Sequence, residues 1–234
     1  MTSMHYHNNE IAKLRLFQII SPSLPIGSFT YSQGMEWAVE NGWIDSIETL
    51  YRWLDSVLLD SLVWLELPVT LRLLEACKTK NEMDFSRWCQ QLLASRETQE
   101  LRQEELNRAR AFLTVLNKLP EAASWPELVN WREDLLKAQT AGFALAAHYW
   151  DIQARDMLQG YAWSWLENSV TVAIKLIPLG QSDGQAVLYQ LAEKLPLITE
   201  QAMNVCDDEI GASTPALAIA SSLHETQYTR LFRS

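Results

Sequence analysis

The stretch from Leu50 to Leu58 constrains the fold of this 234-residue chain more than any other part of the sequence. Its apolar residues fall at i, i+3, i+4, i+7 and i+8, the spacing that gives an α-helix one continuous apolar face: Leu50, Trp53, Leu54, Val57 and Leu58. Eight glycines and eight prolines provide too few turns for a many-stranded sandwich or barrel. We therefore predict an all-α fold, a single-domain helical bundle of about ten helices over residues 1–234.

Capping and turn residues indicate where several helices begin. Asp45, with Glu48 three residues later, has the pattern of a capping box and predicts a helix start. Asp183 lies within the turn predicted at 180–184 and is predicted to cap the next helix. A further helix is predicted over residues 127–150, where the helical pattern is uninterrupted.

Two segments are too polar to belong wholly to a core. The first residues lack an apolar pattern, and we predict a flexible N-terminal tail over residues 1–9. The helix predicted within 96–119 is almost wholly polar in its first half, whereas Ala109, Phe112 and Leu116 give its second half an apolar face. We therefore expect the first half of this helix to project beyond the core.

The charge of the chain argues against two classes of partner. Its formal net charge is −10, and no basic run of the kind that neutralises phosphates is found, so we expect neither nucleic-acid nor membrane binding. The three cysteines form no CxxC pair, which fits a reducing compartment. No signal peptide and no apolar run of about 18 residues are found, so we expect a cytoplasmic protein.

The sequence offers little catalytic or metal-binding chemistry. It contains no phosphate loop, no GxSxG elbow and no HExxH motif. With four histidines, candidates for a metal site reduce to His5 with His7, and to the run 206–209. We favour a free polar tail and a solvated helix end for these two, and we predict no catalytic residue, cofactor or metal ligand.

Four segments of the chain carry a family resemblance. In order, they are Ser21–Glu36, Arg96–Arg102, Ala173–Gln185 and Ser222–Ser234. Their order, spacing and combination resemble the UreF family of urease accessory proteins over nearly the whole chain, from about Leu14 to Ser234.

The resemblance implies an all-α fold and a role in urease maturation, the GTP-dependent delivery of nickel to apo-urease. Members of the family bridge a second accessory protein, UreD (also called UreH), and the nickel-carrying GTPase UreG on apo-urease. By resemblance we therefore expect a homodimer whose partners are UreD, UreG and apo-urease. The expected role is that of a scaffold and regulator, not of an enzyme, and no cofactor is implied.

The candidate site consists of two motifs. Residues 225–234 are predicted to be a C-terminal partner-binding tail, since two arginines and two aromatic side chains in its last eight residues suit an interface hot spot. The proline-stiffened loop 21–36 is expected to lie beside the tail and to form one surface with it. An ordinary tail packed on its own core is the alternative. The predicted partner-binding residues are Tyr31, Glu36, His224, Glu225, Tyr228, Arg230, Leu231 and Phe232.

Two other functions remain open at this point. The chain could be a nickel-binding metallochaperone in its own right, which would require a defined site. It could also activate GTP hydrolysis with Arg230 or Arg102 as an arginine finger. Many members of the family carry a histidine where this chain has Tyr31, so a nickel contact at that position is not expected here.

Overall fold

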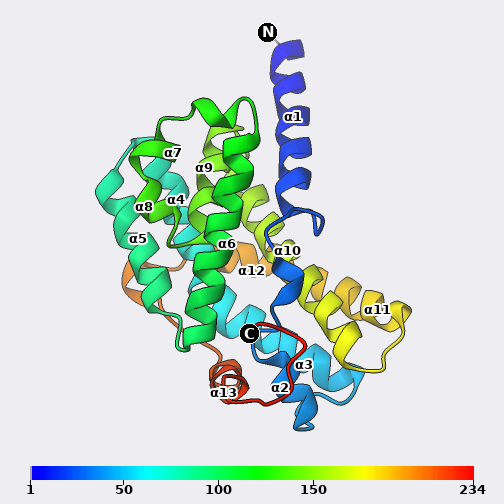
Figure 1. Cartoon of the computed structure of the whole chain (residues 1–234). Coiled ribbons are helices and arrows are strands. Elements are labelled where there is room, and N and C mark those ends of the chain that lie inside the picture. Colours follow the sequence, from blue (N-terminus) through cyan, green and yellow to red (C-terminus); the bar gives the residue numbers. More distant parts are fainter. Residues whose placement is uncertain (1) are drawn as a thin grey trace.

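The computed structural model describes the backbone of residues 2–234 and the side chains of residues 10–234, and all regular structure within them is helical (Figure 1). The α-helices are α1 (Thr2–Ile20), α2 (Met35–Glu40), α3 (Ile47–Val57), α4 (Glu66–Thr79), α5 (Glu82–Ala94), α6 (Gln99–Lys118), α7 (Glu127–Asn130), α8 (Arg132–Leu135), α9 (Gln139–Tyr149), α10 (Ala154–Leu176), α11 (Gln181–Ala192), α12 (Leu195–Met203) and α13 (Pro215–His224). The predicted all-α fold is confirmed.

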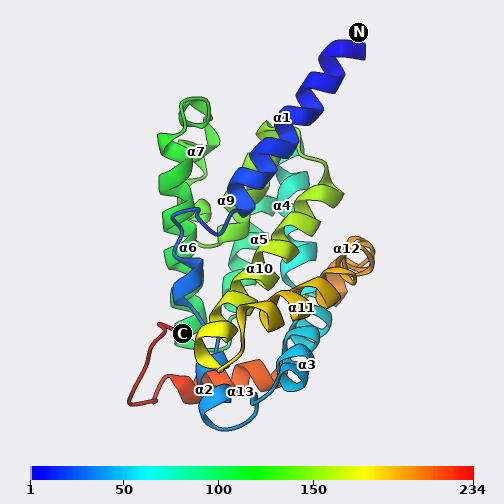
Figure 2. The same cartoon turned by 90° about the vertical axis from the view of Figure 1, so that its right-hand side faces the viewer.

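The helices form two groups joined by α10. In one group α4 packs against α5 and α9, and α6 lies along α9. At the other end, α2 packs on α13 near the C terminus, and α11 packs on α3 and α10 (Figures 1 and 2). One continuous apolar core runs through both groups. The first helix, α1, packs on α10 and extends beyond the rest of the molecule at the end opposite the C terminus (Figure 2).

The first residues do not run as an irregular chain in this structure, because α1 begins at Thr2. The side chains of residues 2–9 and all of Met1 lie outside the described part, so the flexibility expected of residues 1–9 stays a prediction. Among residues 2–234, no helix is both long enough and apolar enough to cross a bilayer.

The helix predicted over residues 127–150 is broken into α7, α8 and α9. It leaves helical geometry at Trp131, with a φ of −105° and a ψ of 21°, and again at Ala138, whose backbone is extended. The ring of Trp131 packs against Phe85 of α5, with the two ring centroids 4.7 Å apart. Burying this large aromatic side chain against another helix stabilises the protein more than continuing one regular helix would.

Two predicted caps lie one position or more from the true helix start. Ser46, not Asp45, caps α3, since its Oγ accepts a hydrogen bond from the backbone nitrogen of Thr49 at 3.3 Å. Asp183 lies inside the first turn of α11, where its carboxylate accepts a hydrogen bond from the backbone nitrogen of Gly180 at 3.1 Å. The Asp183 carboxylate therefore still satisfies a backbone donor at the helix N-terminus, whereas that of Asp45 accepts a hydrogen bond from the side-chain hydroxyl of Thr49 at 3.1 Å.

The first half of α6 does not project into solvent, contrary to the expectation. Glu104 and Glu105 are 3% and 6% exposed, because one face of the polar half of α6 packs against other charged groups, while Gln99, Arg102 and Gln103 remain exposed. Arg96, just before α6, bridges Glu66 of α4 at 2.5 Å and Glu105 at 2.8 Å. The other oxygen of Glu105 accepts a hydrogen bond from the backbone nitrogen of Gln139 at the start of α9, at 2.8 Å.

This network fixes the charge of its central arginine. Burial by itself would lower the pKa of Arg96, but the carboxylates of Glu66 and Glu105 outweigh it and raise that pKa well above its usual value. Arg96 is therefore the permanent cation between two buried anions, and it ties α4 to α6. Removing one member would leave uncompensated charge in the interior.

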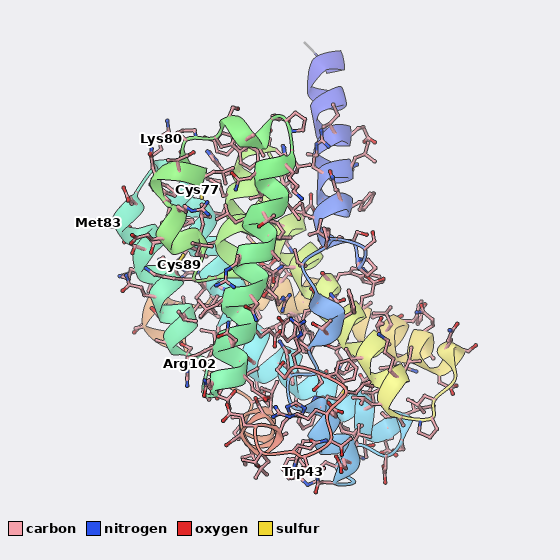
Figure 3. All side chains as sticks on the ribbon, viewed as in Figure 1. Trp43, Cys77, Lys80, Met83, Cys89 and Arg102 are labelled. Carbon is pink, nitrogen blue, oxygen red and sulfur yellow. The ribbon has the colours of Figure 1, made fainter. Side chains whose placement is uncertain are left out.

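All three cysteines are free thiols. Cys77 and Cys89 are buried between helices (Figure 3), and burial raises the pKa of both thiols, which keeps them protonated. Cys206 is exposed.

Candidate functional site

Gly34 brings the loop 21–36 into direct contact with the last helix. It precedes α2 with a φ of 80°, a left-handed conformation that glycine adopts without strain. A Cβ atom at this position would lie 2.5 Å from the backbone nitrogen of Ser221 in α13. The missing side chain therefore allows α2 to lie directly against α13, the helix that leads into the C-terminal tail.

We expect Gly34→Ala to destabilise the protein more than the matched variant Gly42→Ala. Gly42 has a similar φ of 73°, but a Cβ atom there would meet nothing within 4 Å. Both variants should lose about 1–2 kcal/mol from the left-handed backbone, and Gly34→Ala should lose a further 1–3 kcal/mol from overpacking against α13. Urea denaturation followed by circular dichroism measures the difference. Equal losses would show that the close approach of α2 and α13 contributes nothing.

The backbone of the tail, residues 225–234, is hydrogen-bonded to the loop. The backbone nitrogen of Arg233 donates to the carbonyl oxygen of Thr30 at 2.9 Å, and that of Ser32 donates to the carbonyl oxygen of Ser234 at 2.6 Å. The Ser234 hydroxyl donates to Glu104 of α6 at 2.9 Å. The tail is thus an ordered part of the surface, held by segments that lie 130 and 202 residues away in the sequence.

Glu36 is the main side chain that holds the tail. One oxygen of its buried carboxylate accepts a hydrogen bond from the backbone nitrogen of Leu231 at 2.6 Å, and the other accepts one from that of Phe232 at 2.9 Å. Two adjacent amides on one carboxylate fix the direction in which the two side chains leave the backbone. Phe232 is 7% exposed and joins the core, whereas Leu231 is 69% exposed and faces outward.

His224, the last residue of α13, connects this carboxylate to a second one. Its fully buried ring lies with Nε2 3.1 Å from Glu36 and with Nδ1 2.6 Å from Glu100 of α6. Each ring nitrogen therefore lies within hydrogen-bonding distance of one carboxylate, and the ring links α2 to α6. Glu100 is shared further, because its other oxygen binds the guanidinium group of Arg230 at 2.5 Å.

The outward side of the tail combines apolar and basic groups. Tyr228 is fully exposed, and Leu231 and Arg233 are also exposed. An open hollow of about 510 Å³ lies between the tail and α6, lined among others by Tyr31, Glu225, Arg230 and Arg233. Tyr31 is largely buried in its wall, and the carboxylate of Glu225 accepts a hydrogen bond from the backbone nitrogen of Glu100 at 3.1 Å. We call this area, with the exposed residues of the tail, the tail surface.

The predicted site residues therefore lie close together, but some of them are buried and others are exposed. Glu36, His224 and Phe232 are buried and hold the tail, whereas Tyr228 and Leu231 are exposed. The prediction that the loop lies beside the tail agrees with the contacts of Glu36. Sequence reasoning missed Glu100, although it lies within the Arg96–Arg102 motif, because nothing local indicates that it pairs with α13 and the tail.

The two candidate arginine fingers are both bound within the chain. Arg230 is paired with Glu100, and Arg102, on α6 (Figure 3), donates a hydrogen bond to the carbonyl oxygen of Arg96; the distance is 2.6 Å. Among the described side chains, no group of three or more His, Cys, Asp or Glu residues is placed to hold a metal ion. The pair His5 and His7 falls outside the residues whose side chains are described.

Within the candidate run 206–209, two of the three carboxylates have partners in the protein. Asp207 pairs with Arg72 at 2.9 Å, and Glu209 accepts a hydrogen bond from the backbone nitrogen of Cys206 at 3.0 Å. The run, expected to be a solvated helix end, instead follows the end of α12 at Met203 and forms a short 3-10 helix, Asp207–Glu209.

The fold and this site define an all-α protein whose terminal segment is an ordered part of its surface. The chain is similar to proteins named urease accessory protein UreF. The relative from Alcanivorax borkumensis is 57% identical over 228 residues, which cover 97% of this chain and 100% of the relative. Relatives from Pseudomonas putida (strain W619) and Enterobacter sp. (strain 638) are 46% and 41% identical, cover 97% of this chain and are themselves covered to 100% and 99%.

A family model named UreF also matches residues 44–192, the part from the start of α3 to the end of α11. The chain therefore belongs to the UreF family of urease accessory proteins. The loop 21–36 and the tail both lie outside the part that the family model matches. The alignments with the full-length relatives extend over them.

Proposed function

We propose that this protein is a scaffold and regulator of urease maturation that bridges UreD (UreH) and the nickel-carrying GTPase UreG during GTP-dependent insertion of nickel into apo-urease. Membership in the family of urease accessory proteins supports a role in urease maturation. The observation that carries the scaffold role is the tail surface, where exposed apolar and basic side chains are held in fixed positions by buried carboxylates.

The order of the tail favours binding for a physical reason. A segment that becomes ordered only when its partner arrives loses conformational entropy at that moment, which weakens the complex. Here Glu36 and His224 already fix the backbone of the tail, so Tyr228 and Leu231 meet a partner with little further loss. Exposed aromatic and apolar side chains with neighbouring arginines are the usual composition of an interface hot spot.

The same contacts favour a scaffold over an arginine finger. An arginine that enters a GTPase site must leave its own partners first, and Arg230 would have to leave the carboxylate of Glu100. If Arg230 nevertheless acts in this way, Arg230→Ala should lower GTP turnover by UreG within an intact complex. We expect turnover to be unchanged once the amount of complex is equalised.

The experiment that tests the proposal is light scattering after size exclusion, with the protein mixed with UreD and then with UreG and GTP. We expect a ternary complex with the parent chain and its loss with the double variant Tyr228→Ser, Leu231→Ser. The matched control is Tyr189→Ser, Leu197→Ser, which removes the same two exposed side-chain types from α11 and α12. If the parent chain binds neither protein, the proposed role is wrong. If both double variants bind equally well, the tail surface is not the docking site.

A further inference from the structure

Gln33, in the loop that precedes α2, has a backbone conformation that its side chain disfavours. Its φ is 53°, in the left-handed region that residues other than glycine rarely adopt. Gly34 follows with a φ of 80°, so two successive residues of the loop are left-handed. The surrounding structure therefore holds Gln33 in this conformation at a local cost in free energy, and residues held in this way cluster at functional sites.

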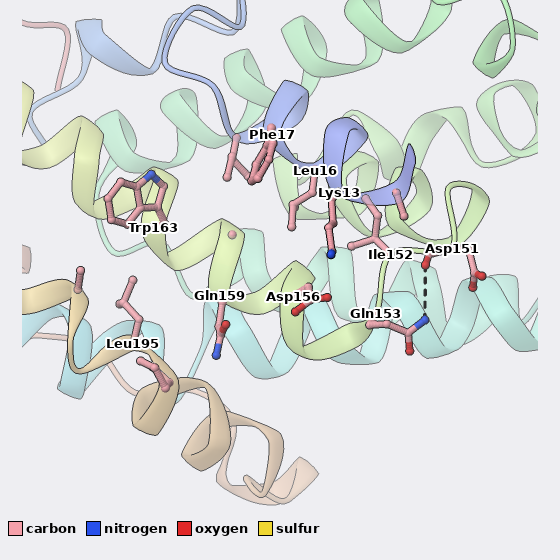
Figure 4. Close-up of a pocket in the computed structure, with 15 residues that line it drawn as sticks. Lys13, Leu16, Phe17, Asp151, Ile152, Gln153, Asp156, Gln159, Trp163 and Leu195 are labelled. Carbon is pink, nitrogen blue, oxygen red and sulfur yellow. Dashed lines mark hydrogen bonds between the residues drawn. The ribbon is translucent and has the colours of Figure 1, made fainter. Parts of the chain in front are cut away.

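Two further residues other than glycine have a positive φ in the described part of the chain, and both have an ordinary reason for it. Lys80, with a φ of 54°, is the C-cap of α4, and Asp151, with a φ of 53°, lies in the turn between α9 and α10 (Figures 3 and 4). Left-handed residues commonly end helices, and aspartate tolerates this conformation better than most residues do. Gln33 instead precedes a helix, so helix termination does not explain its conformation.

The side-chain amide of Gln33 is hydrogen-bonded at both of its ends. Its nitrogen donates a hydrogen bond to the carboxylate of Glu104 in α6 at 2.9 Å, and its oxygen accepts one from the indole nitrogen of Trp165 in α10 at 3.0 Å. Both partners are buried. One amide thus fixes the loop to two helices whose contact residues lie 71 and 132 positions further along the chain.

Glu104 extends this contact to the tail. The oxygen that accepts from Gln33 also binds Arg108 at 3.0 Å, whereas the other oxygen accepts a hydrogen bond from the hydroxyl of Ser234 at 2.9 Å. The backbone beside Gln33 holds the same part of the tail, since the backbone nitrogen of Ser32 donates to the carbonyl oxygen of Ser234 at 2.6 Å. The conformation of the loop and the path of the tail are therefore set together.

We propose that Gln33 is a positioning residue of the tail surface, because its amide keeps the loop in a strained conformation in which the tail is already placed for a protein partner. Glu36 holds the tail directly, whereas Gln33 acts through the loop and through Glu104. Without the amide, more of the tail has to be ordered when the partner binds, which weakens the complex. The effect on binding rests on the proposed function, but the effect on the tail does not.

Hydrogen exchange and partner binding of the full-length variant Gln33→Gly test this inference. Glycine adopts the left-handed conformation without strain but has no amide side chain, so the two effects of the change on stability oppose each other. We therefore expect the melting temperature to change by less than about 4 °C. Exchange at the backbone amides of Ser32 and Arg233, which join the loop to the tail, should nevertheless rise about tenfold, and the complex with UreD and UreG should weaken about tenfold.

A second variant separates the lost contacts from the flexibility of glycine. Asparagine also tolerates the left-handed conformation, but its amide is one methylene shorter and does not reach both Glu104 and Trp165. Gln33→Asn should therefore raise exchange at Ser32 and Arg233 as well. A rise in Gln33→Gly that Gln33→Asn does not share would overturn the inference, because flexibility of the glycine backbone would then explain it.

The matched control is Lys80→Gly, which relieves the same backbone strain at the end of the molecule opposite the C terminus (Figures 1 and 3). It should leave exchange at Ser32 and Arg233 and the binding of partners unchanged. Exchange in Gln33→Gly that equals that of the parent chain would also overturn the inference. A parent chain that binds neither UreD nor UreG would instead contradict the proposed function, while the exchange rates would still decide whether Gln33 holds the tail.

Discussion

Replacing Arg96 with alanine is expected to lower the free energy of unfolding by about 3–5 kcal/mol, because it leaves two buried carboxylates without their common cation. Glu66 and Glu105 lie 2.5 Å and 2.8 Å from the guanidinium group, and both are almost completely buried. Without Arg96, the repulsion between the two carboxylates and their lost hydration both destabilise the folded state. Urea denaturation followed by circular dichroism measures the change.

The control for this variant is Arg52→Ala. Arg52 pairs with Glu48 along α3, but both side chains are exposed, so the loss should be about 0.3–0.5 kcal/mol. If Arg96→Ala cost no more than Arg52→Ala, the network would not hold α4 and α6 together, and the polar half of α6 would need another explanation.

Replacing Glu36 with glutamine is expected to release the tail while leaving the helical core folded. The amide group of glutamine keeps one acceptor oxygen, so its nitrogen, itself a donor, would face the backbone amide of either Leu231 or Phe232. Hydrogen bonds to charged groups contribute about 1.5–3 kcal/mol each. We therefore expect hydrogen exchange at the amides of residues 231 and 232 to rise by about tenfold to a hundredfold.

The matched control is Glu40→Gln on the same helix. The carboxylate of Glu40 is exposed and contacts the side chain of Gln227, so it holds no backbone amide of the tail. Its replacement should leave exchange at residues 231 and 232 unchanged. Equal exchange in Glu36→Gln and the parent chain would mean that the carboxylate does not hold the tail.

The sequence predicts the helices of this protein well where an apolar face is present. The spacing from Leu50 to Leu58 lies in α3 and the first turn after it, as expected. The prediction fails for the first half of α6, because Glu105 looks like a solvent-exposed residue until Arg96 is placed beside it. Pairing of charges across helices is a long-range property that local polarity does not report.

The candidate site shows the same limit. The motifs identify which segments matter, and the structure brings Glu36 and His224 together with the tail. The sequence does not show that Phe232 points inward while its neighbour Leu231 points outward. That difference depends on two backbone hydrogen bonds to one carboxylate, made across nearly 200 residues of chain.

The most direct test of the central claim is hydroxyl-radical footprinting of the full chain, alone and in its complex with UreD and UreG. Tyr228 on the tail and Tyr189 on α11 are both exposed tyrosines, so each serves as an internal reference for the other. We expect oxidation of Tyr228 and Leu231 to fall at least about fivefold in the complex, as complete desolvation at a hot spot requires, while Tyr189 stays unchanged. Undiminished oxidation of Tyr228 in a fully formed complex would contradict the claim that the tail surface is where the partner docks.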